Sequence, residues 1–386
     1  MHNLKAIDQE TIKVLNQKRI IQLLYRKKQL TKQEISQTLN ISIPTVITNV
    51  RELIEQGFLD ESEVGKSSGG RKPVIVSFLP DFKYSIGVLI TKHHFRIILT
   101  NLYFHIVDER IFQVTYNEDG FSSVIASIKE EIDSIITTNN IPIDRILGIG
   151  FSLPGTVNEE NLLLKNAPNL NLKNICFKNF QKDFPVPLYI ENEANASAYA
   201  ESFINFNYAK NSLVFLSITD GIGTGIIIND NVYKGYNRRA GEFGHMTMVK
   251  DGKQCNCGKK GCWEMYASKN ALLEEYNKAF KCKDTNLKDF MEMSKNNLKA
   301  KSILNNYLDF LAEGIKNIIL TLDPEGIIID GEISAYKDLI DGDLKNKIFE
   351  ENNFYDKKDC QVSFSNLEGN AAILGATLIP MKKLFF

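Results

Sequence analysis

The chain has 386 residues, of which 43% are hydrophobic and 24% charged, a balance typical of a soluble globular protein with two or three domains. This composition excludes a wholly disordered, collagen-like or coiled-coil chain, and no apolar run reaches the roughly 20 residues that span a bilayer. Residues 1–10 lack the apolar stretch of a secretory signal. Six cysteines are too few for a disulfide scaffold, so we expect a cytoplasmic protein with no membrane partner.

The charge is unevenly divided along the chain, although the net value is only -1. Residues 1–80 hold 12 lysines and arginines against 8 acidic residues, a balance of +4, and residues 81–386 therefore carry -5. A basic head on an acidic body favours a polyanionic partner for the head, although a solvated surface can also produce a difference of this size.

Three helices are predicted in the head. Apolar residues recur at helical spacing over 9–29. Thr31 followed by Glu34 is a capping box, which opens a short second helix. Ser42 is a good N-cap and Pro44 suits a first helical turn, so a third helix is expected there. A short helix, a tight turn and a longer helix form a helix-turn-helix.

The third helix predicts a DNA-reading surface of short polar or basic side chains, which reach base edges and phosphates in the major groove. These side chains are Ser42, Thr45, Thr48, Asn49 and Arg51. Strand-like runs over 58–64 and 73–78 flank a Gly/Ser-rich tip, the wing of a winged helix, in which Lys66, Arg71 and Lys72 would contact phosphates or the minor groove. The helix patterns alone fit a small helical domain with a basic loop equally well. The capping box, the start of the third helix at Ser42 and Pro44, and the basic tip between the strands together favour double-stranded DNA as the partner.

Beyond residue 80, strand-like and helical segments alternate, which predicts an α/β body. Strands are expected within 84–100 and at 146–151, 188–190, 213–217, 225–228 and 326–329, and helices at 121–138, 194–206, 269–280 and 303–322.

One loop of the body concentrates three of the six cysteines and one of the five histidines. One imidazole and three thiolates form a closed tetrahedral set, which suits a structural zinc ion rather than a catalytic one. The predicted ligands are His245, Cys255, Cys257 and Cys262. Three reduced core cysteines are the alternative, but Asn256, Lys259 and Lys260 make the loop too polar for a core.

Two further motifs are candidate ligand sites. Asn192 and Glu193 follow a strand and open a helix, at the edge of an α/β sheet where ligands bind. Their amide and carboxylate can hold vicinal hydroxyls, although a helix cap would use the same residues. Additional acceptors follow at Glu242, His245 and Glu264. The glycine-rich turn 219–225 suits a phosphate cradle or a simple hairpin equally well.

On these motifs the chain resembles the ROK family of repressors, open reading frames and sugar kinases over nearly its full length, and within it most resembles the xylose repressors of Gram-positive bacteria. The resemblance includes 67–73, 84–87, 153–155 and 190–196 besides the cysteine loop. It implies a winged helix-turn-helix domain over 1–80 and a two-lobed, actin-like sugar-binding domain over 81–386, with a structural zinc loop at 245–262. It also implies a homodimer, which suits a two-fold operator.

The resemblance further implies that a sugar lies in the cleft between the lobes. The implied contacts are Gly155, Asn169, Asn192, Glu193, Glu242, His245 and Glu264. Xylose is the first expectation for this effector. No residue selects it against glucose, another hexose, an N-acetylated sugar or a phosphorylated sugar.

Differences from the family's kinases help to decide whether the chain is a repressor or a sugar kinase. Leu89 and Thr91 replace the Asp and Gly of the kinase phosphate loop; leucine cannot help to hold Mg-ATP, and threonine blocks close backbone approach. Glu193 replaces the kinase's Asp base and shifts the carboxylate by roughly 1 Å, a displacement that can cost ~100-fold in rate. We therefore expect no enzyme but a repressor that sugar releases from its operator. An ATP-dependent sugar kinase with a DNA-binding head, or a regulator whose DNA binding is strengthened by sugar, are the alternatives.

Overall fold

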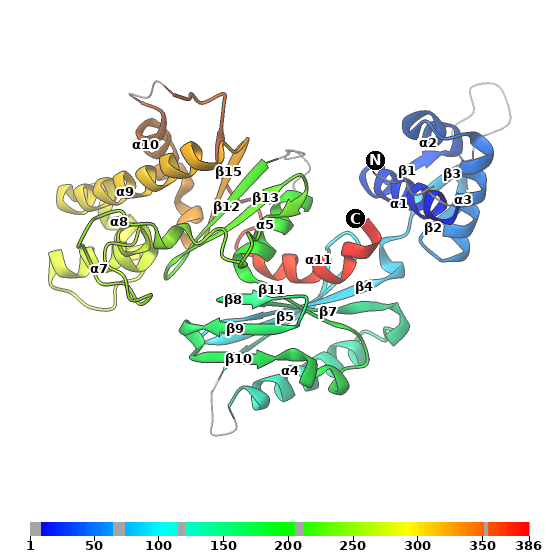
Figure 1. Ribbon diagram of the computed structural model, residues 1–386, viewed down its shortest axis with the longest axis horizontal. Helices are drawn as coiled ribbons and strands as arrows, with labels where there is room; N and C mark the ends of the chain where they lie inside the picture. Colours follow the sequence, from blue (N-terminus) through cyan, green and yellow to red (C-terminus); the bar gives the residue numbers. More distant parts are fainter. Residues whose placement is uncertain (1–8, 65–73, 115–119, 205–211, 351–353, 386) are drawn as a thin grey trace, which may run out of the picture.

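The computed structural model describes residues 9–64, 74–114, 120–204, 212–350 and 354–385 of the chain. Figure 1 shows three bodies, a small N-terminal head in blue and two lobes that each contain a five-stranded sheet. Within these described ranges, no helix is both long and apolar enough to cross a membrane.

The head is a winged helix-turn-helix, as the local signals predict. Thr31 Oγ1 accepts a hydrogen bond from the Glu34 amide at 3.2 Å, and the Glu34 carboxylate accepts one from the Thr31 amide at 2.7 Å, which completes the capping box. Ser42 caps the next helix by accepting from the Thr45 amide. The elements are α1 (Gln9–Lys27), β1 (Gln29–Thr31), α2 (Lys32–Leu39), α3 (Ile43–Glu55), β2 (Leu59–Val64) and β3 (Val74–Phe78), with strand order β1-β3-β2.

The first lobe is a mixed sheet with one helix on its outer face. Its elements are β4 (Tyr84–Ile90), β5 (His94–Asn101), β6 (Ile106–Gln113), α4 (Phe121–Thr138), β7 (Ile146–Leu153) and β11 (Leu188–Asn192), in strand order β11-β7-β4-β5-β6. Apolar residues of α4 pack on those of β4 and β7 to form the core. Because β4, β7 and β11 are parallel, their carboxyl ends meet at one edge, where ligands of α/β sheets bind. A small antiparallel sheet follows β7 at that edge, made of β8 (Thr156–Asn158), β9 (Leu163–Ala167) and β10 (Leu172–Cys176).

The second lobe is a second mixed sheet covered on its outer face by helices. Its strands are β12 (Ser212–Ile218), β13 (Ile222–Ile228), β14 (Asn231–Val232), β15 (Gly326–Asp330) and β16 (Gln361–Phe364), in the order β14-β13-β12-β15-β16. Its helices are α6 (Glu264–Ala267), α7 (Lys269–Phe280), α8 (Leu287–Asn296), α9 (Leu298–Leu322) and α10 (Lys337–Phe349).

Two helices, α5 (Glu193–Ile204) and α11 (Ala371–Phe385), lie between the two sheets and pack on each other (Figure 1). Small residues allow this close approach. A Cβ atom at Gly150 of β7 would stand 2.0 Å from the Ala376 carbonyl oxygen, and one at Gly375 would stand 2.0 Å from the Ala196 carbonyl oxygen. The pair therefore forms one of the contacts through which the two lobes meet.

The structure decides one alternative and adds elements that were not predicted. Residues 219–225 contain a hairpin turn, since Ile218 of β12 pairs with Ile222 of β13 and the last four residues of the motif belong to β13. The helices over 121–138 and 269–280 have the predicted bounds. The elements β6, α8, α10, β16 and α11 were not predicted.

Candidate metal centre and ligand cleft

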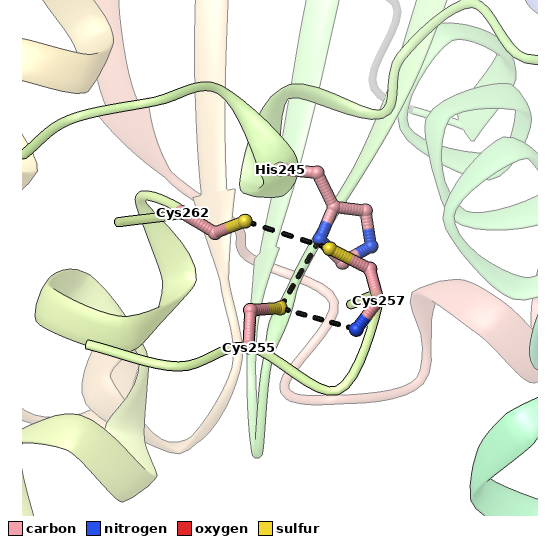
Figure 2. Close-up of side chains that lie close together, drawn as sticks. All are labelled: His245, Cys255, Cys257 and Cys262. Carbon is pink, nitrogen blue, oxygen red and sulfur yellow. Dashed lines mark hydrogen bonds between the residues drawn. The ribbon is translucent and has the colours of Figure 1, made fainter. Parts of the chain in front are cut away.

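Four side chains converge in the loop that follows β14 (Figure 2). His245 comes from the short 3-10 helix η7 (Phe243–His245), and its Nδ1 lies 3.7 Å from Cys255 Sγ. Cys257 Sγ lies 3.6 Å from Cys262 Sγ, and all four ligand atoms lie within 4.8 Å of one another. Zinc–sulfur bonds of ~2.3 Å in a tetrahedron place two thiolates about 3.8 Å apart. The predicted ligands are therefore together, at separations that fit one metal ion.

The loop holds this shape because a glycine allows its tight turn and a buried tryptophan attaches it to α9. Gly261 has a φ of +79°, and a Cβ atom there would stand 1.7 Å from the Val249 carbonyl oxygen. Trp263 is fully buried beside the last cysteine, and its indole N–H donates to the Phe310 carbonyl of α9 at 2.8 Å. The ligand set is thus fixed to the second lobe.

Protonation of the thiols opposes metal binding. Burial raises the pKa of Cys255, whose thiol donates to Glu264 Oε1 at 3.0 Å. A metal ion must displace this proton, so the cluster releases protons when it binds a metal.

Glu242, His245 and Glu264 are brought together beside the β12–β13 turn. His245 Nδ1 lies 3.3 Å from Glu264 Oε1, and its Nε2 lies 3.9 Å from Glu242 Oε2. A Cβ atom at Gly221 would stand 2.7 Å from Glu264 Oε2, so glycine admits the carboxylate to this turn. The histidine therefore joins the metal centre to a group of hydrogen-bond acceptors.

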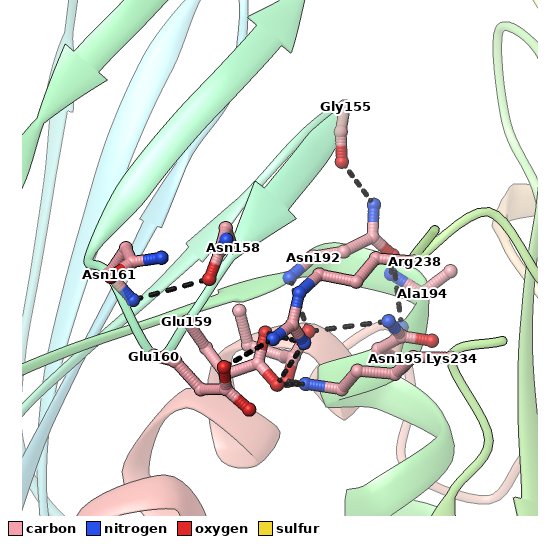
Figure 3. Close-up of polar contacts among 11 residues, drawn as sticks. Gly155, Asn158, Glu159, Glu160, Asn161, Asn192, Ala194, Asn195, Lys234 and Arg238 are labelled. Carbon is pink, nitrogen blue, oxygen red and sulfur yellow. Dashed lines mark hydrogen bonds and ion pairs between the residues drawn. The ribbon is translucent and has the colours of Figure 1, made fainter. Parts of the chain in front are cut away.

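Asn192 lies at the carboxyl end of β11 and caps helix α5 (Figure 3). Its Oδ1 accepts from the backbone amides of Ala194 and Asn195, which caps α5, and its Nδ2 donates to the Gly155 carbonyl at 2.8 Å. The helix-cap alternative is thus realised, and one N–H of the amide remains for a ligand. Gly155 and Asn192 are brought together by the parallel ends of β7 and β11.

Glu193 is the first residue of α5. Burial raises its pKa, and the nearby Asp220 carboxylate raises it further. When protonated, a carboxyl group can donate a hydrogen bond to a hydroxyl as well as accept one from it. Asn169, in the 3-10 helix η3 (Pro168–Leu170), is exposed and has no side-chain hydrogen bond within the described residues.

The positions that kinases would use for phosphate are occupied by other interactions. The Thr91 hydroxyl donates to the His94 carbonyl at 2.8 Å and accepts from the His94 amide at 3.1 Å, so it fills the β4–β5 turn. In the β12–β13 turn, Lys269 Nζ lies 3.3 Å from Asp220 Oδ1 and also pairs with Glu332. Lys269, which contacts this turn through Asp220, is therefore already paired with two carboxylates.

A set of ion pairs, which we call the clasp, connects the loop 233–241 of the second lobe to the first lobe (Figure 3). Lys234 Nζ lies 2.6 Å from both Glu159 and Glu191, and Arg238 lies 2.9 Å from Glu159 and 2.8 Å from Glu160. Sequence reasoning missed these residues, because no local pattern pairs side chains that are 43 or 79 positions apart.

One residue of the predicted DNA-reading surface is wrongly placed. Asn49 is 3% exposed, and its Nδ2 donates to the Thr45 carbonyl at 2.8 Å. It follows the buried Val46 by three positions, so it lies on the core face of α3 and does not face outward. Ser42, Thr48 and Arg51 are exposed and Thr45 is partly exposed. Lys66, Arg71 and Lys72 lie outside the described residues.

A winged helix-turn-helix joined to two lobes that meet through a central helix pair defines a class of protein, a DNA-binding head on an actin-like body. The model of the ROK family matches residues 85–383, and a model described as winged helix-turn-helix DNA-binding matches residues 15–60. The chain belongs to the ROK family.

The relatives include proteins with and without a head. A xylose repressor of Bacillus spizizenii is 32% identical over 343 residues, which cover 88% of each chain. A crystal structure of a ROK family transcriptional regulator, a homologue of the Escherichia coli MLC protein, has a TM-score of 0.82 at 24% identity and covers 97% of each chain. A ROK family glucokinase from Streptomyces griseus, in complex with glucose and AMPPNP, has a TM-score of 0.65 at 21% identity and covers 78% of this chain and 99% of its own. The two structures show the fold.

Proposed function

We propose that the protein is a cytoplasmic, homodimeric repressor that a sugar releases from operator DNA. The head, over residues 1–80, reads the duplex, and the body, over 81–386, binds the sugar. The observation that carries this proposal is the combination of two features in one chain. The cleft assembles acceptors for sugar hydroxyls, whereas the hydroxyl of Thr91 fills the turn that would have to hold a phosphate.

Xylose is our first candidate for the sugar, because the relative at 32% identity is a xylose repressor. We assign the sugar contacts to Gly155, Asn169, Asn192, Glu193, Glu242, His245 and Glu264. We assign the DNA contacts of α3 to Ser42, Thr45, Thr48 and Arg51, with Lys66, Arg71 and Lys72 in the wing.

We also propose that His245, Cys255, Cys257 and Cys262 hold a structural zinc ion. The donor set of one imidazole and three thiolates supports zinc, and it leaves no open position for catalysis. An ion held through Nδ1 would fix the ring of His245 and leave its Nε2, which lies 3.9 Å from Glu242 Oε2, for a sugar hydroxyl.

Sugar binding can reach the head through α5. This helix begins at Glu193 in the cleft and carries Phe203 near its other end. The Phe203 ring lies 5.5 Å from the ring of Tyr25 in α1, which in turn lies 5.2 Å from Tyr103 of the first lobe. Closure of the lobes would therefore displace the head, and a 10- to 100-fold loss of DNA affinity needs only about 1.4–2.7 kcal/mol of coupling.

The second candidate function is an ATP-dependent sugar kinase, which the fold shared with a glucokinase favours. Asp220 and Glu332, which flank Lys269, argue against it, because carboxylates would repel the phosphates of a nucleotide. A coupled ADP-release assay with a panel of pentoses and hexoses tests this. We expect no turnover above background, and turnover with any of these sugars would establish the kinase instead.

The repressor proposal is tested with DNA selected from a random duplex library on the purified full-length protein. Fluorescence anisotropy of the selected duplex is then measured with and without each sugar of the same panel. We expect xylose, or another member, to weaken binding at least tenfold. If no sugar changes the affinity, release by a free sugar is wrong, and if a sugar strengthens binding, the protein is a corepressor-type regulator. Light scattering checks the expected dimer.

A further inference from the structure

We propose that the sugar cleft contains a subsite for an anionic group, so that a sugar carrying a phosphate or a carboxylate binds more tightly than its neutral parent. The inference rests on the proposed function and specifies its ligand class. The subsite is a cavity of about 330 Å³ between the small sheet of the first lobe and the loop 233–241 of the second. Its lining residues are Thr156, Lys165, Asn166, Asn237 and Arg239.

The cations of this region fall into two groups. Lys234 and Arg238 are each paired with two glutamates of the clasp, at 2.6–2.9 Å. Lys165 and Arg239 line the cavity, and no acidic side chain within the described part of the chain lies at ion-pair distance from either. Two positive charges that face one cavity without a carboxylate between them attract an anion. A guanidinium can hold a phosphate or carboxylate through two parallel hydrogen bonds.

The cavity also offers polar groups for the sugar itself. Thr156, Asn166 and Asn237 supply one hydroxyl and two amides, and they line the same cavity as the two cations. Hydroxyl and amide groups can exchange hydrogen bonds with sugar hydroxyls. The cavity therefore suits a ligand that has an anionic group and a hydroxyl close together, as a sugar phosphate or a sugar acid has.

One lining residue of the cavity directly follows a proposed sugar contact in the chain. Thr156 pairs with Asn166 across β8 and β9, and it directly follows Gly155, whose carbonyl accepts from the Asn192 amide. A sugar on Asn192 thus has the cavity as its neighbour. Lys165 belongs to the first lobe and Arg239 to the loop of the second, so an anion held by both would favour the closed arrangement of the lobes.

The test is calorimetric titration of the full-length protein with matched ligands. The pairs are glucose and glucose 6-phosphate, xylose and xylose 5-phosphate, and glucose and glucuronate, with inorganic phosphate alone as a further arm. We expect at least one anionic sugar to bind at least tenfold more tightly than its neutral parent. The phosphate and carboxylate arms distinguish the two sources of charge.

The variants Lys165→Gln and Arg239→Gln should each remove most of this preference and leave the affinity for the neutral sugar within about twofold. Lys173→Gln is the matched control, because this exposed lysine of β10 does not line the cavity. Thermal unfolding checks that each variant is folded.

Equal affinity for neutral and anionic sugars, or a preference that survives both substitutions, would overturn the subsite. Tight binding of inorganic phosphate without any gain for a sugar phosphate would also overturn it. If the subsite is overturned in one of these ways but a neutral sugar still releases the operator DNA, the repressor proposal remains valid. Failure of every neutral and anionic sugar to move the DNA affinity would contradict the repressor proposal itself.

Discussion

Gly314, in the middle of α9, leaves the space that the Trp263 ring occupies beside the metal loop. A Cβ atom at position 314 would stand 1.9 Å from this ring, which has no room to move because it is fully buried. We therefore expect Gly314→Ala to lower the free energy of unfolding by about 1–3 kcal/mol, in spite of the better helix propensity of alanine. Urea unfolding measures this.

The matched control is Gly342→Ala in α10, where a Cβ atom would meet nothing within 4 Å. This variant should gain up to about 1 kcal/mol, because only helix propensity changes. If the two alanine variants had equal stability, the tight packing of Trp263 against α9 would be disproved.

Cys257 offers a direct test of the metal centre, because its side chain is exposed and its loss leaves no core cavity. We expect Cys257→Ser to reduce bound zinc from about one ion per chain to a small fraction, since serine is a poor zinc ligand. Elemental analysis of the purified protein measures the content. Cys176→Ser, outside the cluster, should keep the full content, and a serine variant at 257 that kept it too would remove this cysteine from the ligand set.

At the scale of elements, α5 runs from Glu193, a proposed sugar contact, to Phe203, whose ring lies against Tyr25 of the head. Phe203→Ala should leave sugar affinity within about threefold, because the residue lies ten positions away from Glu193, about 15 Å along the helix. The change in DNA affinity on adding sugar should fall from at least tenfold to less than threefold. Anisotropy of the selected duplex, with and without sugar, measures both effects.

Phe112→Ala is the control for this prediction. Its ring stacks on Phe95 in the first lobe at 5.3 Å and lies outside the cluster of rings around Tyr25. This variant should keep full coupling. If Phe203→Ala kept it as well, the signal would have to travel by another element, for example α11.

At the scale of the whole molecule, the clasp ties the two lobes together through Glu159. Burial opposes the charge of this carboxylate, but the hydrogen bond and charge of Lys234 outweigh it, so its pKa is lowered in the folded protein. The clasp therefore stabilises the fold fully above the ordinary pKa of 4.5, and this contribution is lost as the pH falls through the lower folded value.

Glu159→Gln tests the clasp. We expect the variant to be less stable by about 1 kcal/mol near neutral pH, the upper end for partly exposed ion pairs. The difference should shrink as the pH falls below 4.5, because the unfolded chain binds a proton at Glu159 there and the folded wild type does so only at its lower pKa. Urea unfolding of both proteins over this pH range measures the effect, and a difference that did not change with pH would mean that the glutamate acts through packing instead.

Much of the head was predictable, because its signals are local. The capping box of Thr31 and Glu34 lies within one helical turn, and Ser42 and Pro44 mark the start of α3 by their own backbone preferences. Asn49 was misplaced because polarity alone does not show which face of a helix a residue occupies. Helix α11 escaped prediction because it contains Pro380 and is apolar on nearly all sides, so it has neither a clean start signal nor an amphipathic period.

Patterns local in the sequence were enough to establish a helix-turn-helix and four side chains within 18 positions that could hold a metal ion. Short spacing makes such features visible, since residues close along the chain can meet only in a few ways. The contacts across the cleft became visible only in three dimensions, namely the clasp, the cavity lined by Lys165 and Arg239, and the rings that join α5 to the head. Those contacts depend on how two sheets are placed about a helix pair, and no local pattern encodes that placement.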